Sequence, residues 1–259
     1  MDADWNPRLY LRFEAQRTRP ARDLLARVAL DAPAQVIDLG CGPGNSTELL
    51  IERFPQARVV GIDHSEAMLT SARARLPGCR FELGDIASWQ PETAPDLIYA
   101  NAALQWVGAH ETLVPRLFAQ LAPGGVLAIQ TPDNLDEPSH RLMREVASQA
   151  PYATLCDDAA GVRTRLLPLE TYYDLLAPRA AEVEVWCTVY QHPMATAASI
   201  VDWLRSTGLK PYLDPLPEAL RTTFLADYER RIALACPPRA DGRRLLAFPR
   251  RFIVAQRAR

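Results

Sequence analysis

A glycine-rich loop follows the first strongly apolar run of the chain. The segment 36–39 leads into Gly40, Gly42 and Gly44, so that a glycine stands at every second position. Because glycine has no Cβ, such a loop turns sharply and lets its backbone approach a bound molecule. A loop of this kind between a strand and a helix is typical of nucleotide-binding sites. Its spacing, G-x-G-x-G, differs from the dinucleotide fingerprint G-x-G-x-x-G, so the loop alone does not identify the ligand.

Carboxylates stand at the ends of the next two strand-like runs. Asp63 closes one run about twenty residues after the loop, where a carboxylate can accept hydrogen bonds from both hydroxyls of a ribose. Asp85 follows the run 79–84, where it can accept from the amino group of an adenine. Asn45 or Ser46, directly after the loop, is predicted to cap the following helix. Three strand ends that carry glycine or aspartate therefore predict one crevice for an adenosine-containing ligand.

Two other interpretations of these residues compete with an adenosine site. In the first, the glycines only form a tight turn and the aspartates only cap helices. Three strand ends that carry such residues together make this explanation the weaker one. In the second, the chain is a dinucleotide oxidoreductase. The only lysine, Lys210, has Ser206 four residues before it, so a Tyr-x-x-x-Lys proton relay cannot be written anywhere in the chain. Hydride transfer by that relay is excluded.

The three strand ends resemble the cofactor motifs of the class I S-adenosylmethionine-dependent methyltransferases. The resemblance implies that Gly40 and its loop contact the methionine part, and that Asp63 holds the ribose. Residues 85–86 would face the adenine. Asn101 would bind the methionine amine through its backbone carbonyl, and Asp38 would hold the loop or receive the amine through water. The predicted cofactor set is Asp38, Gly40, Gly42, Asn45, Asp63, His64, Met68, Asp85, Ile86 and Asn101.

Apolar runs alternate with helical patterns in the order that an α/β fold requires. Strands are predicted near 34–39, 57–62, 79–84, 95–100 and 124–131. With the resemblance, they predict a doubly wound, Rossmann-like sheet that is mostly parallel. Ser65 is expected to cap the helix after the second strand, and His110 is expected in solvent at the start of a later one.

The second half of the chain contains two helical stretches and two further strand patterns. The strands, near 183–190 and 244–255, are predicted to form an antiparallel hairpin at the sheet edge, where Pro249 is tolerated. The helical stretches would form a cap over the carboxyl ends of the strands, where open α/β sheets bind ligands. The predicted methyltransferase core comprises 1–132, 181–192 and 243–259. The predicted cap comprises 133–180 and 193–242.

Segments outside the cofactor motifs are similar to a narrower family, the trans-aconitate 2-methyltransferases. They span nearly the whole chain and comprise 15–21, 100–106, 137–145, 207–211 and 248–255. The resemblance implies an enzyme that forms the monomethyl ester of a small polycarboxylic acid, with trans-aconitate as the expected substrate. Arginine suits such a substrate because its planar fork pairs bidentately with carboxylates. The predicted substrate set is Arg17, Arg19, Gln105, Trp106, His140, Arg144, Tyr173, Tyr190 and His192.

The reaction implied by the resemblance needs no catalytic residue in the acid-base sense. A substrate carboxylate would attack the sulfonium methyl group in line, and S-adenosylhomocysteine would leave. Carboxylates are already ionised at neutral pH, so the protein must supply alignment and exclude water rather than remove a proton. Each substrate candidate also has a plain structural interpretation: arginine is most often a solvated surface charge, and Tyr172 or Tyr173 can simply pack.

Composition limits the partners. The 259 residues carry a formal net charge of −2, and the 29 basic residues form no run, which disfavours nucleic acid as a partner. The five cysteines lie far apart, so neither a metal site nor a disulfide framework is expected, and a reducing cytosol suits them. The acidic start and the lack of a long apolar run predict a soluble, cytoplasmic protein without a membrane partner, as a monomer or weak dimer.

Two alternative functions remain open at the level of sequence. One is methylation of a malonyl group on an acyl carrier protein, an acidic partner that would require an exposed basic docking face. Arg230, Arg231, Arg243 and Arg244 are the arginines that could form such a face. The other is a cofactor-binding protein without turnover, which would need no closed polar pocket beside the sulfonium.

Overall fold

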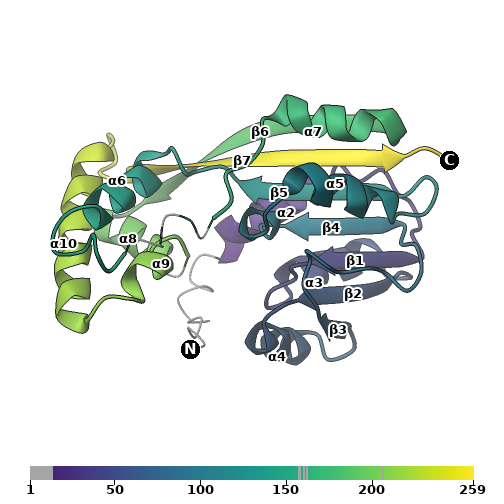
Figure 1. The fold of residues 1–259 in the computed structure, drawn as a ribbon, viewed down its shortest axis with the longest axis horizontal. Helices are drawn as coiled ribbons and strands as arrows, with labels where there is room; N and C mark the ends of the chain where they lie inside the picture. The colour runs from purple at the N-terminus through teal and green to yellow at the C-terminus, as the bar shows by residue number, and fades with distance from the viewer. Residues whose placement is uncertain (1–13, 157–158, 160, 162, 206) are drawn as a thin grey trace. The chain divides into compact units, whose positions relative to one another are not determined.

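The computed structural model describes residues 14–259 apart from 157–158, 160, 162 and 206. Its strands form a seven-stranded sheet in the order β3-β2-β1-β4-β5-β7-β6 (Figure 1). The strands are β1 Gln35–Leu39, β2 Arg58–Asp63, β3 Arg80–Leu83, β4 Leu97–Asn101, β5 Val126–Pro132, β6 Ala180–Met194 and β7 Arg244–Arg257. The ladders that join β3, β2, β1, β4 and β5 are parallel, and β7 pairs antiparallel with β5. This is the predicted doubly wound α/β class.

The helices alternate with the parallel strands and continue in the second half of the chain. They are α2 Glu14–Leu25, α3 Asn45–Arg53, α4 Glu66–Arg75, α5 His110–Ala119, α6 Pro138–Ala147, α7 Leu169–Leu176, α8 Ala197–Arg205, α9 Lys210–Leu213 and α10 Glu218–Ala235. Two short 3-10 turns, η1 Leu104–Trp106 and η3 Ala177–Arg179, complete the described elements. Ser65 caps α4 as predicted, with its Oγ 3.4 Å from the backbone nitrogen of Met68. None of the described helices is both long enough and apolar enough to cross a membrane.

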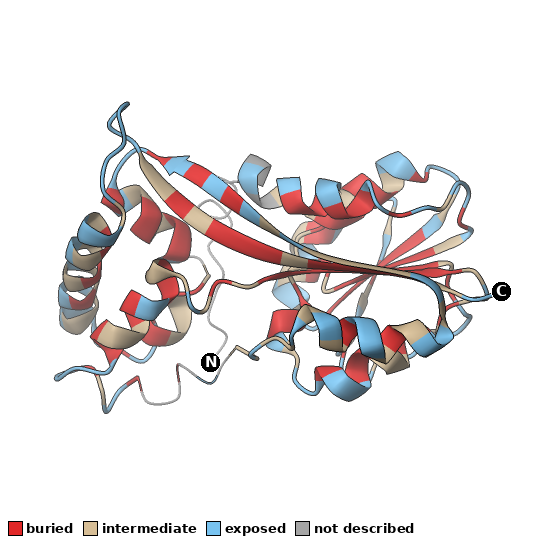
Figure 2. Ribbon diagram, turned by 90° about the horizontal axis from the view of Figure 1, so that it is seen from above, coloured by how far each residue is buried: buried red, intermediate tan, exposed pale blue. Residues whose placement is uncertain are grey.

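Successive side chains of a central strand point to opposite faces of the sheet, and different helices cover the two faces. In β1, Ile37 and Leu39 belong to the same buried cluster as Leu113 and Leu117 of α5. The residue between them, Asp38, points to the other face and reaches α3. Because both of their faces are covered, β5 is buried along its whole length, and β1 and β4 are buried at every position but one end residue each. Buried residues are red in Figure 2 and dominate the strands of the sheet.

The edge of the sheet differs from its predicted arrangement. Pro249 was expected on an edge strand, but β7 lies between β5 and β6, and β6 forms the edge. The ladder between β5 and β7 ends at the pair formed by Pro132 and Arg250. Pro249 therefore lies just outside that ladder, where its missing N–H group costs no hydrogen bond to β5.

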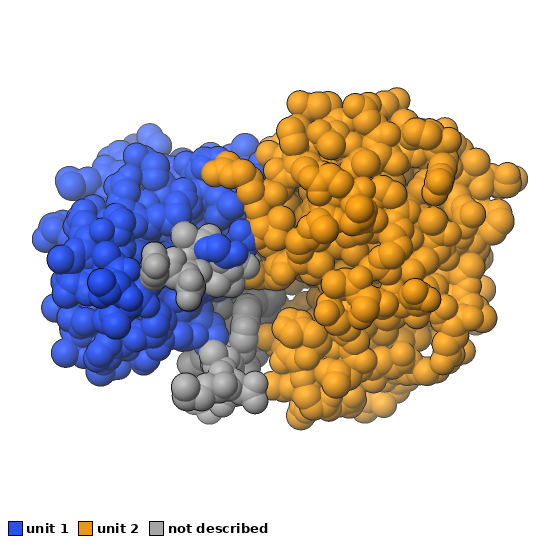
Figure 3. All heavy atoms as spheres, in the orientation of Figure 1, with its two compact units in different colours: residues 1–16, 133–163, 189–249 blue, residues 17–132, 164–188, 250–259 orange. Residues whose placement is uncertain are grey.

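The chain divides into two compact units, drawn in different colours in Figure 3. The sheet unit comprises 17–132, 164–188 and 250–259. The cap unit takes in 133–163 and 189–249 together with the beginning of α2. This division differs from the predicted boundaries in four described places: 164–180 belongs to the sheet unit, and 14–16, 189–192 and 243–249 belong to the cap unit. The physical reason why 164–180 belongs to the sheet unit is α7, whose Tyr172 and Leu176 are buried in the same cluster as α5.

The cap unit has an apolar core of its own. Residues from α6, α8, α9 and α10 contribute to it, and Trp203, Phe224 and Tyr228 are among its largest fully buried side chains. Tyr228 also donates a hydrogen bond of 2.6 Å to the carbonyl of Ser139, which ties α10 to the start of α6. The first turn of α6 is therefore fixed by packing and by a buried hydrogen bond.

Candidate functional site

Asp38, which precedes the glycine loop, holds the first turn of the helix that follows the loop. Its side chain is completely buried, and Oδ2 accepts hydrogen bonds from Ser46 at 2.8 Å and Thr47 at 2.7 Å. Burial raises the pKa of Asp38 to about 6, although these two hydrogen bonds oppose the shift. The expectation that Asn45 or Ser46 caps α3 is wrong: the N-cap residue is Gly44, and Ser46 serves Asp38 instead.

The glycines of the loop have different structural roles. Gly40, Gly42 and Gly44 all have positive φ angles, of 71°, 54° and 89°, which favour glycine. At Gly40, a Cβ atom would lie 2.3 Å from the Cβ of Ala103, in the segment after β4. At Gly42, a Cβ would meet nothing within 4 Å. Gly40 is thus required by close packing, whereas Gly42 faces open space that a ligand can fill.

Asp63 binds the glycine loop as well as its own turn. Its Oδ2 accepts a hydrogen bond from the backbone N–H of Gly42, and its Oδ1 accepts one from Ser65, both at 2.9 Å. The carboxylate is 7% exposed, so it is held in place by its surroundings. His64, beside it, is exposed, with Nδ1 3.6 Å from Oδ1 of Asp63. Each carboxylate oxygen can accept a further hydrogen bond, so the geometry permits the predicted contact with a ribose.

The segment after β3 forms a turn that an arginine holds. Asp85 is exposed, and its Oδ1 accepts from the backbone of Ala87 at 2.9 Å, while Ile86 is buried. Arg116 of α5 donates to the carbonyls of Ile86 at 2.7 Å and of Trp89 at 2.6 Å. The sequence analysis did not single out Arg116, because nothing in its local pattern distinguishes it from a surface arginine.

The segment after β4 is held in an uncommon conformation. Ala102 has a φ of 53°, and its carbonyl accepts a 2.6 Å hydrogen bond from Nε2 of Gln105 in η1. Gln105 is buried, whereas Trp106 is 41% exposed. Among the described residues, Oδ1 of Asn101 and Oε1 of Gln105 are buried without a hydrogen-bond partner. Such acceptors are costly unless a ligand or water completes them.

A buried histidine of α5 holds η1 in place. His110 was expected in solvent, but it is 3% exposed. Its Nδ1 lies 2.5 Å from the hydroxyl of Tyr172, and its Nε2 lies 2.8 Å from the carbonyl of Leu104. The burial follows from the helix that covers it, α7, which the sequence had assigned to the cap. Tyr173, the predicted substrate residue beside Tyr172, is 47% exposed.

In the cap unit, the predicted histidines and Tyr190 are core residues. His192 is 5% exposed, and its ring centroid lies 4.8 Å from that of Trp203 and 6.2 Å from that of Tyr190. His140 is also buried, with Nδ1 3.1 Å from the hydroxyl of Ser139 and its ring against Phe248. Burial lowers the pKa of His140 well below its usual value, and two nearby arginines lower it further.

Those two arginines are Arg144 and Arg163. Arg144 follows His140 by one helical turn on α6, and its NH2 group is 4.0 Å from Oδ1 of Asp136. Arg163 donates a 2.7 Å hydrogen bond from NH1 to the side-chain oxygen of Asn134. Arg163, Asn134 and the nearby Tyr212 were missed from the sequence because they come from separate segments that only folding brings together. We call His140, Arg144, Arg163, Asn134 and Tyr212 the cap cluster.

The remaining candidates lie outside these groups. Arg19 is exposed, with Nε 3.9 Å from Oδ2 of Asp23, and the side chain of Arg17 lies outside the described residues. The structure therefore divides the predicted substrate set, with Arg19, Gln105, Trp106 and Tyr173 in the sheet unit and His140, Arg144, Tyr190 and His192 in the cap unit. In the described part of the chain, no cluster of three or more His, Cys, Asp or Glu could hold a metal ion.

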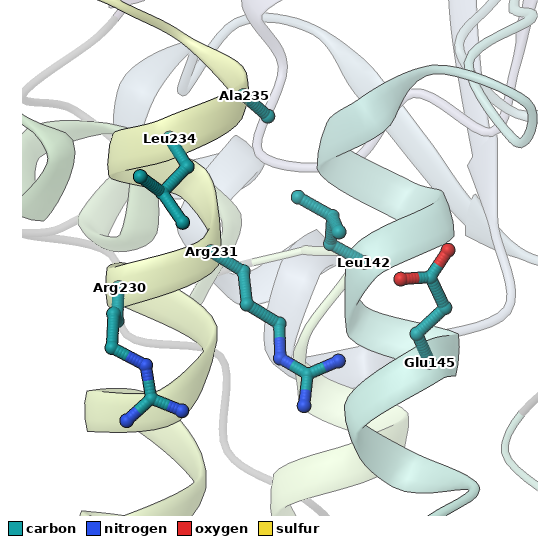
Figure 4. Close-up of a pocket in the computed structure, with 6 residues that line it drawn as sticks. All are labelled: Leu142, Glu145, Arg230, Arg231, Leu234 and Ala235. Carbon is teal, nitrogen blue, oxygen red and sulfur yellow. The ribbon is translucent and has the colours of Figure 1, made fainter.

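An open groove of about 580 Å³ lies in the cap unit between α6 and α10, and no residue of the predicted cofactor or substrate sets lines it. Figure 4 shows Arg231 extending from α10 toward α6, and this arginine donates to Gln149 at 2.8 Å and to Asp227 at 3.0 Å. Arg230 pairs with the same aspartate, and Arg244 donates to carbonyls at the end of α10. These arginines have internal partners, which counts against the basic docking face that an acyl carrier protein would need.

The topology of the sheet and the glycine loop define the class of protein. Residues 30–190 match the family described as Methyltransferase domain. Two solved structures share the fold. The first is a putative methyltransferase from Bacillus halodurans, which is 13% identical in sequence and has a TM-score of 0.60; the match covers 93% of this chain and 100% of that chain. A phosphoethanolamine N-methyltransferase 2 from Haemonchus contortus, in complex with S-adenosylhomocysteine, is 17% identical with a TM-score of 0.56 and covers 93% of this chain and 53% of its own.

Sequence similarity narrows the class to one family. The trans-aconitate 2-methyltransferase of Paracidovorax citrulli is 69% identical over 257 residues, which cover 98% of this chain and 99% of that protein. The chain belongs to the trans-aconitate 2-methyltransferase family. The methyltransferase class and this family were both predicted from the sequence and are confirmed.

Proposed function

We propose that the protein transfers a methyl group from S-adenosylmethionine to a carboxylate of a small polycarboxylic acid, with trans-aconitate as the substrate. The observation that carries the substrate class is the cap cluster, which gathers two guanidinium groups around an uncharged histidine. Guanidinium groups that are partly removed from water favour anions, and their planar forks match carboxylates. Membership of the trans-aconitate 2-methyltransferase family supports the same substrate.

The residues at the carboxyl ends of β1 and β4 fit a ligand that carries positive charge. Three of the buried acceptor atoms without a hydrogen-bond partner among the described residues belong to this region: Oδ1 of Asp38, Oδ1 of Asn101 and Oε1 of Gln105. Acceptors of this kind suit the methionine amine of the cofactor, directly or through water. Asp63 and the turn at 85–86 would hold the ribose and the adenine. When bound, S-adenosylmethionine supplies an electrophilic methyl group on a sulfonium.

The protein's own contribution is to bind, orient and desolvate. Arg163 stays charged at neutral pH, since burial lowers its pKa only to about 10. His140 stays neutral, because burial and the two arginines lower its pKa. The pKa of Tyr212 is raised by burial, so its phenol stays protonated. None of these three groups changes charge between about pH 6.5 and 8.5, and a carboxylate nucleophile does not either.

The pH dependence of the chemical step tests this function. Single-turnover rates at saturating cofactor and acid should be nearly flat from about pH 6.5 to 8.5. When the methyl group of the cofactor carries a label, mild base should release that label from the product. A methyl ester is hydrolysed under these conditions, whereas a methyl ether or a methylamine is not. A rate that rises tenfold per pH unit, or a base-stable product, would mean that a hydroxyl or an amine is methylated instead.

A further inference from the structure

Three backbone carbonyls of the turn 85–89, which follows β3, converge on one guanidinium group. Arg116 of α5 donates to the carbonyls of Ile86 at 2.7 Å, Ala87 at 3.0 Å and Trp89 at 2.6 Å. A guanidinium group can hold several acceptors at once because its N–H donors form a rigid, planar fork. The turn is therefore attached by polar contacts to a helix from a later part of the chain.

A single peptide group connects Arg116 to Asp85. The carbonyl of Ile86 accepts its hydrogen bond from Arg116. The N–H of the same peptide group belongs to Ala87, and it donates to Oδ1 of Asp85 at 2.9 Å. Because a peptide group is planar, a guanidinium that fixes the direction of the carbonyl also fixes the direction of the N–H. The orientation of the exposed Asp85 carboxylate thus depends on Arg116.

Two other attachments keep the turn in place. The N–H of Gly84 donates to the carbonyl of Asp63 at 2.9 Å, which ties the start of the turn to the end of β2. Ile86 is buried in the same apolar cluster as Leu113 of α5. These contacts do not involve the guanidinium group. We therefore expect a chain that lacks Arg116 to fold with the turn still attached, but with the peptide groups of the turn less ordered.

We propose that Arg116 is a positioning residue that makes the cofactor site selective for adenine. By fixing the peptide group between Ile86 and Ala87, it directs the carboxylate of Asp85 toward the amino group of the base. This inference rests on the part of the proposed function that places the adenine at 85–86. Arg116 acts through the turn and does not bind the cofactor itself.

Two ligands that differ in the base test this selectivity. S-adenosylhomocysteine has an amino group on its base, whereas S-inosylhomocysteine has a carbonyl oxygen in its place. A carboxylate accepts a hydrogen bond from the amino group and repels the oxygen. Dissociation constants for both ligands are measured by calorimetry on the full chain. The readout is the ratio of the two constants, because a general loss of stability or affinity weakens both ligands alike and leaves the ratio unchanged.

The variants are Arg116→Met, Arg116→Lys and Asp85→Asn, with Arg257→Met as the matched control. Arg257 of β7 is half-buried like Arg116, and it also donates to backbone carbonyls, those of Ala119 at 3.1 Å and Leu121. It lies beside the start of β5, whereas the predicted cofactor residues lie at the carboxyl ends of the parallel strands. The control therefore removes a similar set of hydrogen bonds at the opposite end of the sheet.

The parent should bind S-adenosylhomocysteine about 10-fold more tightly than S-inosylhomocysteine, the scale for a hydrogen bond to a charged group. In Arg116→Met this ratio should fall below about 3-fold, because a carboxylate that is not held in place gains little from the amino group. Arg116→Lys should give a ratio between these two, since it keeps the charge and loses the fork. Asp85→Asn should lower the ratio as well, because an amide can donate to the oxygen. Arg257→Met should keep the ratio of the parent, even where thermal unfolding shows a loss of stability.

A ratio in Arg116→Met equal to that of the parent, or an equal fall in Arg257→Met, would overturn the role of Arg116. If Arg116→Met does not fold, Arg116→Lys decides by the same ratio. A parent without preference for adenine, or a ratio that Asp85→Asn leaves unchanged, would overturn both this role and the placement of the adenine. Because no methyl transfer is measured, a parent that shows the expected ratios but methylates no acid would leave the inference standing and overturn the proposed function.

Discussion

At the scale of single residues, Asp63 does two things at once. It holds the glycine loop through Gly42 and its own turn through Ser65, and we expect it to accept hydrogen bonds from the ribose as well. The first role is a feature of the structure, and the second stays a prediction. Because the same carboxylate serves both, its position is fixed before the cofactor arrives, which is the condition for tight binding without reorganisation.

Replacing Asp63 tests its contact with the ribose. Asp63→Ala should weaken S-adenosylmethionine binding by about 2–3 kcal/mol, the scale for hydrogen bonds to a charged group. Asp31→Ala is the matched control, because Asp31 is an exposed aspartate that precedes β1, whereas the predicted cofactor residues lie at the other end of that strand. Calorimetric titration measures both variants. An affinity for the cofactor unchanged by Asp63→Ala would rule out the ribose contact.

The residues that could be predicted from the sequence are those in local patterns. Asp38, Gly40 and Asp63 were found because each stands at a strand end beside a loop of recognisable composition. Arg163 and Tyr212 could not be found in this way, because their importance depends on segments that are distant in the chain and adjacent only after folding. The same limit explains why Tyr190 and His192, chosen by resemblance, turned out to be packed in the core of the cap unit.

At the scale of elements, the glycine loop meets the segment after β4. A Cβ atom built at Gly40 would lie 2.3 Å from the Cβ of Ala103, so a side chain at position 40 would fit only if one of these two segments shifted. The loop is therefore a closely packed junction between β1 and β4.

Two alanine substitutions separate packing from backbone strain. Gly42→Ala should lower the free energy of unfolding by about 1–2 kcal/mol, the cost of a left-handed conformation for a residue with a Cβ. Gly40→Ala should cost about 1–3 kcal/mol more, because the new methyl group also overlaps with Ala103. Adding Ala103→Gly should recover the excess at Gly40 and none of the loss at Gly42. Urea unfolding measures all four variants, and equal losses for the two single substitutions would contradict this packing.

The parallel strands were predictable to within a few residues because each is a short apolar run bounded by turn residues. The elements that were misassigned are those whose place depends on a partner. The amphipathic face of α7 does not say which surface it covers, and only the structure shows that it packs on α5. The edge position of β6 likewise follows from pairing between distant strands, which local patterns do not encode.

At the scale of the whole molecule, the buried charge of Asp38 sets a pH dependence of stability. Its pKa is about 6 in the folded protein and 3.8 as the ordinary value. Between these two values the unfolded chain has lost the proton that the folded chain retains, so stability falls as pH rises and is constant above the higher value. The difference of about 2 pKa units corresponds to about 3 kcal/mol.

Asp38→Asn should remove this dependence. Relative to the variant, the parent should lose about 3 kcal/mol of unfolding free energy between about pH 4 and 6, with no further change up to pH 8. Denaturant unfolding at a series of pH values gives the difference curve. A curve that is flat, or that rises with pH, would mean that Asp38 is stabilised as a carboxylate by its hydrogen bonds to Ser46 and Thr47.

The central claim is that this chain is an enzyme that methylates a small polycarboxylic acid. Its most direct test is transfer of a labelled methyl group from S-adenosylmethionine by the full chain to a panel of di- and tricarboxylates, with identification of the product. The account predicts that trans-aconitate is methylated with the highest kcat/KM and yields a monomethyl ester. Binding of the cofactor with no label in any acid would contradict it and would leave a carrier-bound malonyl group or a protein without turnover.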